Sequence, residues 1–329
     1  MKRLTALGAT AGAFVAAGVA AKVLDGRRHE TVRRELESTV RFGTVHSPSR
    51  TVVATDGTAI NVEIDEAEGR RRRGTQPTIV FVHGWVCTLD SWHFQRLALR
   101  GRYRMVFMDQ RSHGGSGRSR ADNSSLADLA DDLRRVIEEC AADGPVVLVG
   151  HSMGGMTIME LAGLDPDLFG DKVVAAMLIG TSSGKLIGRA PGFVKLAPLL
   201  RVASPALDWG RGFNSRSLMR RWAVGPDAAD VYVDMSDQMI REARTHVLLD
   251  FYPNFVTLDT TAGLKDLGRV PTVVVGGTKD MLTPFKHARR LAEDIPGATL
   301  VAVEGAGHMV MFEAHERVTQ ALEGLLERI

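Results

Sequence analysis

VLVGHSMGG, residues 147–155, combines a run of apolar residues with a serine that glycines closely flank. PVVLVG (145–150) predicts a buried strand, and the MTIMELAGLDP that follows the motif has helical character. G-x-S-x-G between a strand and a helix forms a sharp turn that lifts the serine hydroxyl to the top of a sheet. We expect Gly150 and Gly154 to lie where neighbouring backbone leaves no room for a Cβ, and we expect Ser152 to adopt a strained conformation.

Further apolar runs on both sides of this motif indicate that its strand belongs to a larger sheet. Helical stretches separate the runs, and LADLADDLRRVIEEC (126–140) is one example. Strands that are apolar throughout are buried on both faces, which is typical of parallel sheets covered by helices. Asp56 and Gly57 predict a hairpin between two alternating strands. The fold class is therefore α/β, with a mostly parallel, doubly wound sheet. Its predicted parallel strands lie within residues 77–84, 102–109, 145–150, 172–180, 270–277 and 298–305.

The alternation of strands and helices stops between residues 182 and 262. Short amphipathic pieces broken by Pro and Gly come first, and residues 226–255 then predict two helices. A helical insertion after the strand ending near residue 180 would cover the ligand site, because open α/β sheets bind ligands beyond the carboxyl ends of their strands. The predicted parts are an N-terminal segment (1–41), a first core part (42–181), a helical cap (182–262) and a second core part (263–329).

Composition is that of an ordinary globular protein, with 44% hydrophobic and 24% charged residues in 329. A formal net charge of +2 is too mild to indicate a nucleic-acid partner. Cys87 and Cys140 are the only cysteines, and they have neither disulfide-framework nor zinc-ligand spacing. DQRSHGGSG (109–117) lacks both GxGxxG and a Gly-Lys-Ser/Thr ending. We therefore expect no nucleotide, no other cofactor and no metal.

The N-terminal segment is the part of the sequence that indicates where the protein is located. Residues 4–21 are uncharged and follow two basic residues, a pattern that fits a secretory signal, a short membrane anchor or an uncleaved membrane-proximal helix. Residues 22–41 predict a charged surface helix with an apolar stripe. The segment favours membrane association or export to the cell envelope or beyond, and it leaves a cytoplasmic location open.

Five motifs, taken in order, resemble the α/β-hydrolase family in its serine esterase and lipase branch with a helical cap. They are VHGW (82–85), DQRSHGGSG (109–117), GHSMGG (150–155), GGTKDMLTP (276–284) and GAGHMVMFE (305–313). The resemblance extends from about residue 44 to residue 329 and is more specific for the fold than for the substrate. It implies that the second motif is a tight loop beside the active site, with Asp109, Arg111 and His113 as hydrogen-bonded scaffold.

A serine hydroxyl needs a base to act as a nucleophile, and that base is most often a histidine held by a carboxylate. Asp280 and His308 each follow a predicted strand, and the chain order Ser, Asp, His is that of the family. Alone, Asp280 would be a loop cap and His308 a core histidine. With Ser152 they predict a catalytic triad at one edge of the sheet.

The anionic intermediate of acyl transfer also needs hydrogen-bond donors, each worth about 3 kcal/mol. Met153 follows the nucleophile, and its backbone N–H at the helix start is one predicted donor. Trp85 matches the family position for the second N–H, and its large side chain would narrow an acyl pocket. His83 is expected to brace this loop.

The main hypothesis is hydrolysis of a small carboxylic ester through an acyl-enzyme. Epoxide hydrolases and haloalkane dehalogenases are disfavoured because they carry an aspartate where this chain has Ser152. Perhydrolases, thioesterases and hydrolases of carbon–carbon bonds share the triad and stay open, as does a non-catalytic ligand-binding protein. The oligomeric state is not predicted. A weak preference for lipid-like esters comes from apolar cap residues: Phe193, Leu196, Leu199, Leu200, Trp209, Phe213, Trp222, Phe251, Tyr252 and Phe255.

Overall fold

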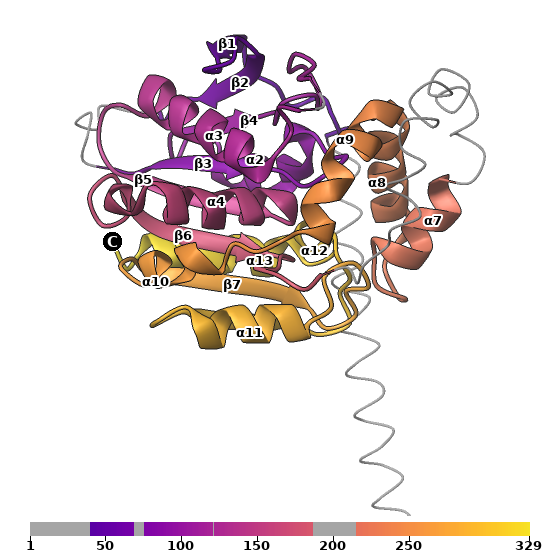
Figure 1. Ribbon diagram of the computed structural model, residues 1–329. Coiled ribbons are helices and arrows are strands. Elements are labelled where there is room, and N and C mark those ends of the chain that lie inside the picture. The colour runs from indigo at the N-terminus through magenta and orange to yellow at the C-terminus, as the bar shows by residue number, and fades with distance from the viewer. Residues whose placement is uncertain (1–39, 69–75, 121, 187–214) are drawn as a thin grey trace, which may run out of the picture. The chain divides into compact units, whose positions relative to one another are not determined.

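An eight-stranded sheet organises the unit that spans His46–Ile329, in the order β1-β2-β4-β3-β5-β6-β7-β8 (Figure 1). The computed structural model describes residues 40–68, 76–120, 122–186 and 215–329. Residues Met1–Val45 form a separate unit. The strands are β1 (Ser49–Val53), β2 (Ala59–Asp65), β3 (Thr78–Val82), β4 (Met105–Met108), β5 (Val146–His151), β6 (Val173–Ile179), β7 (Thr272–Gly277) and β8 (Thr299–Val303).

Strand directions confirm the predicted α/β class. β1 pairs antiparallel with β2, and β2 pairs antiparallel with β4. All other neighbouring strands are parallel. Asp56 and Gly57 form the predicted turn between β1 and β2, where Gly57 has a φ of 86° and Thr58 N–H donates to Asp56 Oδ1 at 3.0 Å.

Helices cover both faces of this sheet. They are α2 (His93–Leu99), α3 (Leu126–Cys140), α4 (Met153–Leu164), α7 (Ser215–Trp222), α8 (Asp230–Glu242), α9 (Thr245–Val256), α10 (Leu264–Leu267), α11 (Lys286–Asp294), α12 (Val310–Glu313) and α13 (His315–Leu326). Short 3-10 turns lie at η1 (Leu89–Trp92), η2 (Pro166–Leu168) and η4 (Thr261–Gly263). On one side α3 packs on α4, which also contacts α10, and on the other α2 packs on α13.

Side chains of β3 alternate between the two faces of the sheet, so this strand contributes to the apolar packing on both faces. Val80 and Val82 lie in the same apolar cluster as buried residues of α3 and α4. Phe81 points to the opposite face, where its ring stacks on Phe107 and contacts Trp92. Successive side chains of a strand point to opposite faces, so a wholly apolar strand needs cover on both.

One strand departs from the prediction. Residues 298–305 were predicted as a strand buried on both faces, but most side chains of β8 are partly exposed and Ala302 is exposed. The reason is position, because β8 pairs only with β7 and ends the sheet. Local composition does not reveal which strand lies at an edge.

The described part of the predicted cap is helical. α8 and α9 confirm the two helices predicted in residues 226–255, and α7 precedes them (Figure 1). Within the described residues of 182–262, strand pairing is limited to an isolated bridge between Gly184 and Asp259. The cap residues 187–214 lie outside the described residues, and the domain boundaries stay a prediction.

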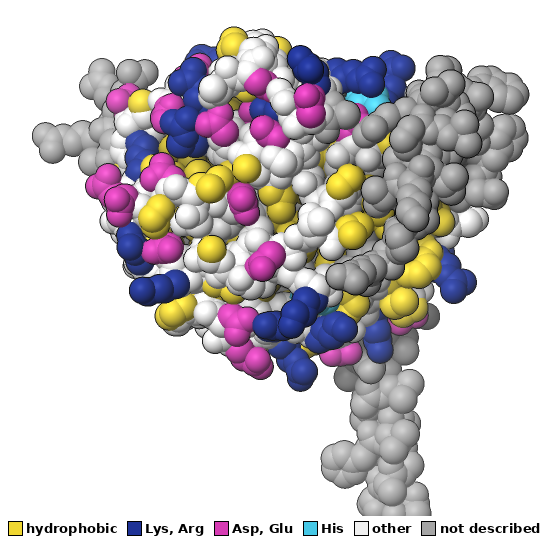
Figure 2. All heavy atoms as spheres, viewed as in Figure 1, with side chains coloured by type: hydrophobic (Ala, Val, Ile, Leu, Met, Phe, Trp, Pro, Cys, Tyr) yellow, Lys and Arg dark blue, Asp and Glu magenta, His cyan; other side chains and the backbone are white. Residues whose placement is uncertain are grey.

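The predicted signal or anchor also lies outside the described residues, which begin at residue 40. Among the helices of the described ranges, none has both the length and the hydropathy required to span a bilayer. On the face of the molecule in Figure 2, basic and acidic side chains are interspersed, in keeping with the mild net charge of +2.

Candidate active site

Ser152 occupies the sharp turn between β5 and α4. Its backbone has a φ of 51° and a ψ of −115°, a conformation that costs a residue with a side chain about 1 to 3 kcal/mol. A Cβ built on Gly150 would lie 2.6 Å from the Gly154 carbonyl oxygen, and one built on Gly154 would lie 2.1 Å from that of Val82. Both glycine expectations and the strained serine are therefore confirmed. The turn places Ser152 at the carboxyl end of the central strands.

His308 and Asp280 come together at the same end of the sheet. His308 lies in the loop between β8 and α12, and Asp280 follows β7. His308 Nδ1 is 2.9 Å from Asp280 Oδ2, and both side chains are buried. Asp280 Oδ1 accepts hydrogen bonds from the N–H groups of Leu282 and Thr283, each at 2.8 Å. These bonds fix the carboxylate, so a Nδ1–H of His308 donates to it and leaves Nε2 to act as a base.

A cavity of about 380 Å³ joins Ser152, the predicted nucleophile, to His308, the predicted base. Ser152 and His308 both line it, which brings all three predicted triad residues into one site. Cys87 lines it as well, but burial raises the pKa of its thiol to about 12. A thiol with that pKa stays protonated at neutral pH and is a poor nucleophile.

Both predicted oxyanion donors border Ser152. Met153 begins α4, and the loop carrying Trp85 passes so close that a Cβ on Gly84 would lie 3.1 Å from Ser152 Cβ. Among the hydrogen bonds that join described residues, neither the Trp85 nor the Met153 backbone N–H is a donor. Each N–H therefore has its donor capacity left for an oxyanion.

The indole of Trp85 has a role that the sequence did not reveal. Its Nε1–H donates to the Val247 carbonyl oxygen of α9 at 3.0 Å, and its ring contacts that of Phe255 at 4.9 Å between centroids. Trp85 lines the cavity, as predicted for a residue that narrows an acyl pocket. It also connects the loop that follows β3 to the cap.

His83 braces the loop that follows β3, as predicted. Its Nε2 accepts from Gln110 N–H at 3.0 Å, while Gln110 Nε2 donates to the His83 carbonyl oxygen at 2.7 Å. Burial lowers the pKa of His83 to about 4, so the ring is neutral at pH 7. A neutral ring suits an acceptor in a buried loop.

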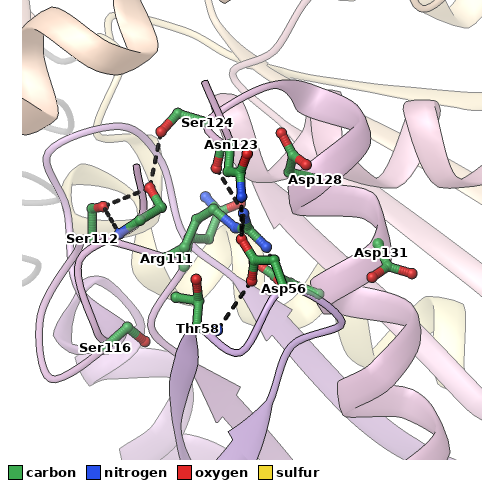
Figure 3. A network of polar contacts seen from close by, with 12 residues as sticks. Asp56, Thr58, Arg111, Ser112, Ser116, Asn123, Ser124, Asp128 and Asp131 are labelled. Atoms are coloured by element: carbon green, nitrogen blue, oxygen red, sulfur yellow. Dashed lines mark hydrogen bonds and ion pairs between the residues drawn. The ribbon is translucent and has the colours of Figure 1, made fainter. Parts of the chain in front are cut away.

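The loop 109–117 is hydrogen-bonded scaffold, also as predicted. Asp109 accepts from Leu89 N–H at 2.8 Å and from Gly115 N–H at 2.9 Å. Arg111 binds Asp132 through two hydrogen bonds of 2.6 and 2.7 Å. Figure 3 shows Arg111 and Asn123 converging on Asp56 of the β1–β2 turn. The network fixes the loop beside the site without entering the cavity.

Apolar side chains dominate the cavity wall. Of the predicted cap residues, Trp222 and Phe255 line it, whereas Phe251 is buried against His113. Tyr252 is half-buried and away from the cavity. Among the described lining residues, none is Lys, Arg, Asp or Glu. The cap residues that lie outside the described residues are Phe193, Leu196, Leu199, Leu200, Trp209 and Phe213.

Two residues near His308 were not predicted to belong to the site. His151 Nε2 lies 3.1 Å from the His308 carbonyl oxygen, and burial holds the pKa of His151 well below its usual value, so the neutral ring donates. Glu313 is buried, and its carboxylate accepts from Gly307 N–H. A single acidic residue in the apolar stretch VMFE is the signal that could have identified it.

The alpha/beta hydrolase family model matches residues 79–321, and the chain therefore belongs to this family. It is 29% identical over 257 residues to the dihydrolipoyllysine-residue acetyltransferase component of the acetoin cleaving system of Pseudomonas putida. That match covers 76% of this chain and 63% of the relative, so the chain spans less than two thirds of that protein's length.

Solved structures of esterases and lactonases share the fold. The thermophilic esterase of Thermogutta terrifontis is 22% identical, with a TM-score of 0.69 over 86% of this chain and 99% of that one. The enol-lactonase of Burkholderia xenovorans LB400 is also 22% identical, with a TM-score of 0.69 over 84% of this chain and 100% of that one. The family match supports hydrolase function in general, and the two solved structures show the shared fold.

Proposed function

We propose that this protein hydrolyses a carboxylic ester through an acyl-enzyme, with Ser152 as nucleophile, His308 as base and Asp280 as its orienting carboxylate. The observation that carries the proposal is the 2.9 Å contact between Asp280 Oδ2 and His308 Nδ1 beside a cavity that Ser152 also lines. A serine at a strained strand-to-helix turn, next to an oriented imidazole, is the arrangement that acyl transfer requires.

In the first half of the reaction, Ser152 Oγ attacks the carbonyl carbon while His308 Nε2 takes the hydroxyl proton. The N–H groups of Trp85 and Met153 bind the resulting oxyanion. His308 then gives the proton to the departing alcohol as the C–O bond breaks. In the second half, water attacks the acyl-enzyme while His308 takes a proton from it, and His308 returns that proton to Ser152 Oγ as the acyl–oxygen bond breaks and the carboxylic acid leaves.

The cavity wall supports an uncharged, apolar acyl or alcohol group. A buried charge without a partner is costly, and the described lining residues supply no opposite charge. Apolar burial is worth about 25 cal/mol per Å², so the substrate would gain affinity in proportion to its apolar surface. A lipid-like ester meets both conditions.

Serine substitution and covalent labelling test the chemistry. We expect Ser152→Ala to abolish turnover of a panel of p-nitrophenyl esters and to abolish labelling by a fluorophosphonate probe. Full turnover by Ser152→Ala would refute the nucleophile. Folded wild-type protein that takes no label would instead favour a non-catalytic binding protein, and faster turnover of matched thioesters would favour a thioesterase.

The N-terminal segment supports a location at the membrane or in the cell envelope, because residues 4–21 are uncharged. Fractionation of cells that express the whole chain, compared with a chain lacking residues 1–41, tests this part of the proposal. Equal distribution of the two chains in the soluble fraction would contradict it.

A further inference from the structure

Glu313, at the end of α12, is a buried carboxylate that joins two segments far apart in the sequence. Its Oε1 accepts from Gly307 N–H at 3.0 Å, and its Oε2 accepts from Gly225 N–H at 2.7 Å. Gly307 immediately precedes His308, and Gly225 follows α7 of the cap. One side chain therefore binds the backbone of both the loop that carries the proposed base and the cap.

These two segments are in direct backbone contact. A Cβ built on Gly225 would lie 2.1 Å from the Gly305 carbonyl oxygen, and one on Gly307 would lie 2.4 Å from Gly225 N. Beyond His308 the contact continues, because Met309 N–H donates to the Ala223 carbonyl oxygen at 2.8 Å. The cap segment thus holds the chain on both sides of His308.

The same contact forms part of the substrate cavity. Ala223 and Met309 line it together with His308. Any shift of the cap segment would move the cavity wall and the loop of the base at once. A displacement of about 1 Å near a reacting group can lower a rate by about 100-fold.

Burying a carboxylate at this position costs free energy unless its oxygens accept hydrogen bonds that the fold requires. Burial raises the pKa of Glu313 to about 6, while the N–H groups of Gly225 and Gly307 oppose that rise. An apolar side chain of the same size would avoid the desolvation cost but would leave two buried N–H groups unpaired. The two buried N–H groups therefore explain why a side chain that accepts hydrogen bonds lies here.

We propose that Glu313 is a positioning residue that couples the cap segment Ala223–Gly225 to His308, so that substrate cavity and base are set together. This inference rests on the proposed function for the role of His308. It adds a coupling between cap and base that the triad itself does not contain.

Two substitutions of Glu313 separate acceptor chemistry from side-chain size. Glu313→Leu keeps the bulk and leaves both N–H groups unpaired, so kcat for a p-nitrophenyl ester should fall by about 10- to 100-fold. Oε2 also accepts from Gly307 N–H at 3.1 Å, so the one oxygen that Glu313→Gln keeps can accept from both groups, and kcat should stay within about threefold of wild type. As a matched control, Ile137→Ala opens a cavity in α3 and should lower the melting temperature while leaving kcat unchanged.

Gly225→Ala disturbs the same contact from the cap side. Its Cβ would displace the Gly305 loop, so kcat should fall as in Glu313→Leu. The variant that combines both substitutions should have a kcat no lower than that of the less active single variant. If Glu313→Leu does not fold, Gly225→Ala alone carries this comparison. Wild-type kcat in either folded variant, or losses that multiply in the double variant, would overturn the coupling.

An NMR readout keeps this test independent of the proposed reaction. The hydrogen-bonded Nδ1 proton of His308 reports its contact with Asp280 without turnover. We expect its resonance to be retained in Glu313→Gln and shifted or lost in Gly225→Ala. An unchanged resonance in Gly225→Ala would overturn the coupling even if the wild-type protein hydrolysed no ester.

Discussion

Asp280 reaches His308 with only one of its two carboxylate oxygens. Oδ2 lies 2.9 Å from His308 Nδ1, whereas Oδ1 accepts from the N–H groups of Leu282 and Thr283. Because the two oxygens have different hydrogen-bond partners, Oδ2 is the oxygen that faces the imidazole. This arrangement therefore determines what an amide at the same position would do.

Asp280→Asn should lower kcat by about 10³- to 10⁴-fold without unfolding the protein. The amide oxygen would take the place of Oδ1, because two N–H groups donate there, and the amide nitrogen would face His308 Nδ1. His308 would then carry its proton on Nε2 and could not accept one from Ser152. Steady-state kinetics on a p-nitrophenyl ester measures the effect.

Thr283→Val is the graded comparison for that experiment. It removes the 2.7 Å hydrogen bond from Thr283 Oγ1 to Asp280 Oδ2 and leaves the carboxylate in place. We expect a loss of about tenfold or less. If Asp280→Asn were no slower than Thr283→Val, another group would have to orient His308.

Gly154→Ala should destabilise the protein by about 3 kcal/mol, because its Cβ would lie 2.1 Å from the Val82 carbonyl oxygen in a core without spare volume. Gly324→Ala is the matched control in helix α13, where a Cβ meets nothing within 4 Å. It should stabilise by about 0.5 to 1 kcal/mol. Urea unfolding of both variants measures the two free energies, and equal effects would contradict the packing argument.

Local sequence was sufficient for the nucleophile turn and for the strands. Ser152 has a positive φ, and Gly150 and Gly154 lie where a Cβ would clash with neighbouring backbone, so the five-residue motif specifies its own turn. The convergence of Asp280 and His308 was also predictable, because parallel strands end at one edge. These features depend on near neighbours or on a general rule of topology.

Features that depend on long-range contacts were not predictable. The exposed edge at β8 follows from strand order, which the composition of residues 298–305 does not encode. The bond from Trp85 to Val247 and the bond from Gly225 to Glu313 each join the core to the cap. No spacing rule links such positions, so their roles become visible only when the chain is folded.

The contribution of two buried histidines to stability should fall as the pH drops from 6.5 toward 4. His83 and His113 are buried with ring centroids 5.3 Å apart, and burial lowers their pKa values to about 4 and about 3. In this window the unfolded chain binds protons that the folded protein does not. The free energy of unfolding therefore decreases by up to about 1.4 kcal/mol per pH unit for each ring.

Urea unfolding at about pH 7 and about pH 5.5 measures this slope, and His113→Phe should make it shallower. Glu313 and Asp132 act in the opposite direction, since burial raises both pKa values to about 6. Both carboxylates are present in the wild type and the variant, so the difference in slope isolates His113. Identical slopes would mean that His113 becomes protonated within the fold.

Chain-length selectivity should respond to a single cap residue that faces the cavity. Met239 of α8 is buried and lines the cavity of about 380 Å³, so Met239→Trp would fill part of the space for an acyl chain. We expect kcat/KM for an octanoyl ester to fall by about tenfold or more, since each lost methylene contact is worth about 1 kcal/mol or more. Turnover of an acetyl ester, which needs little of the cavity, should stay within about threefold of wild type.

Gln238→Trp places the same indole one residue earlier on the exposed face of α8, and it should leave both esters unaffected. A loss that is equal for acetyl and octanoyl esters in Met239→Trp would show that the substitution disturbs the site as a whole. Unchanged octanoyl turnover would instead mean that the acyl chain lies elsewhere. Only a selective loss in Met239→Trp identifies this apolar cavity as the place where the acyl group is bound.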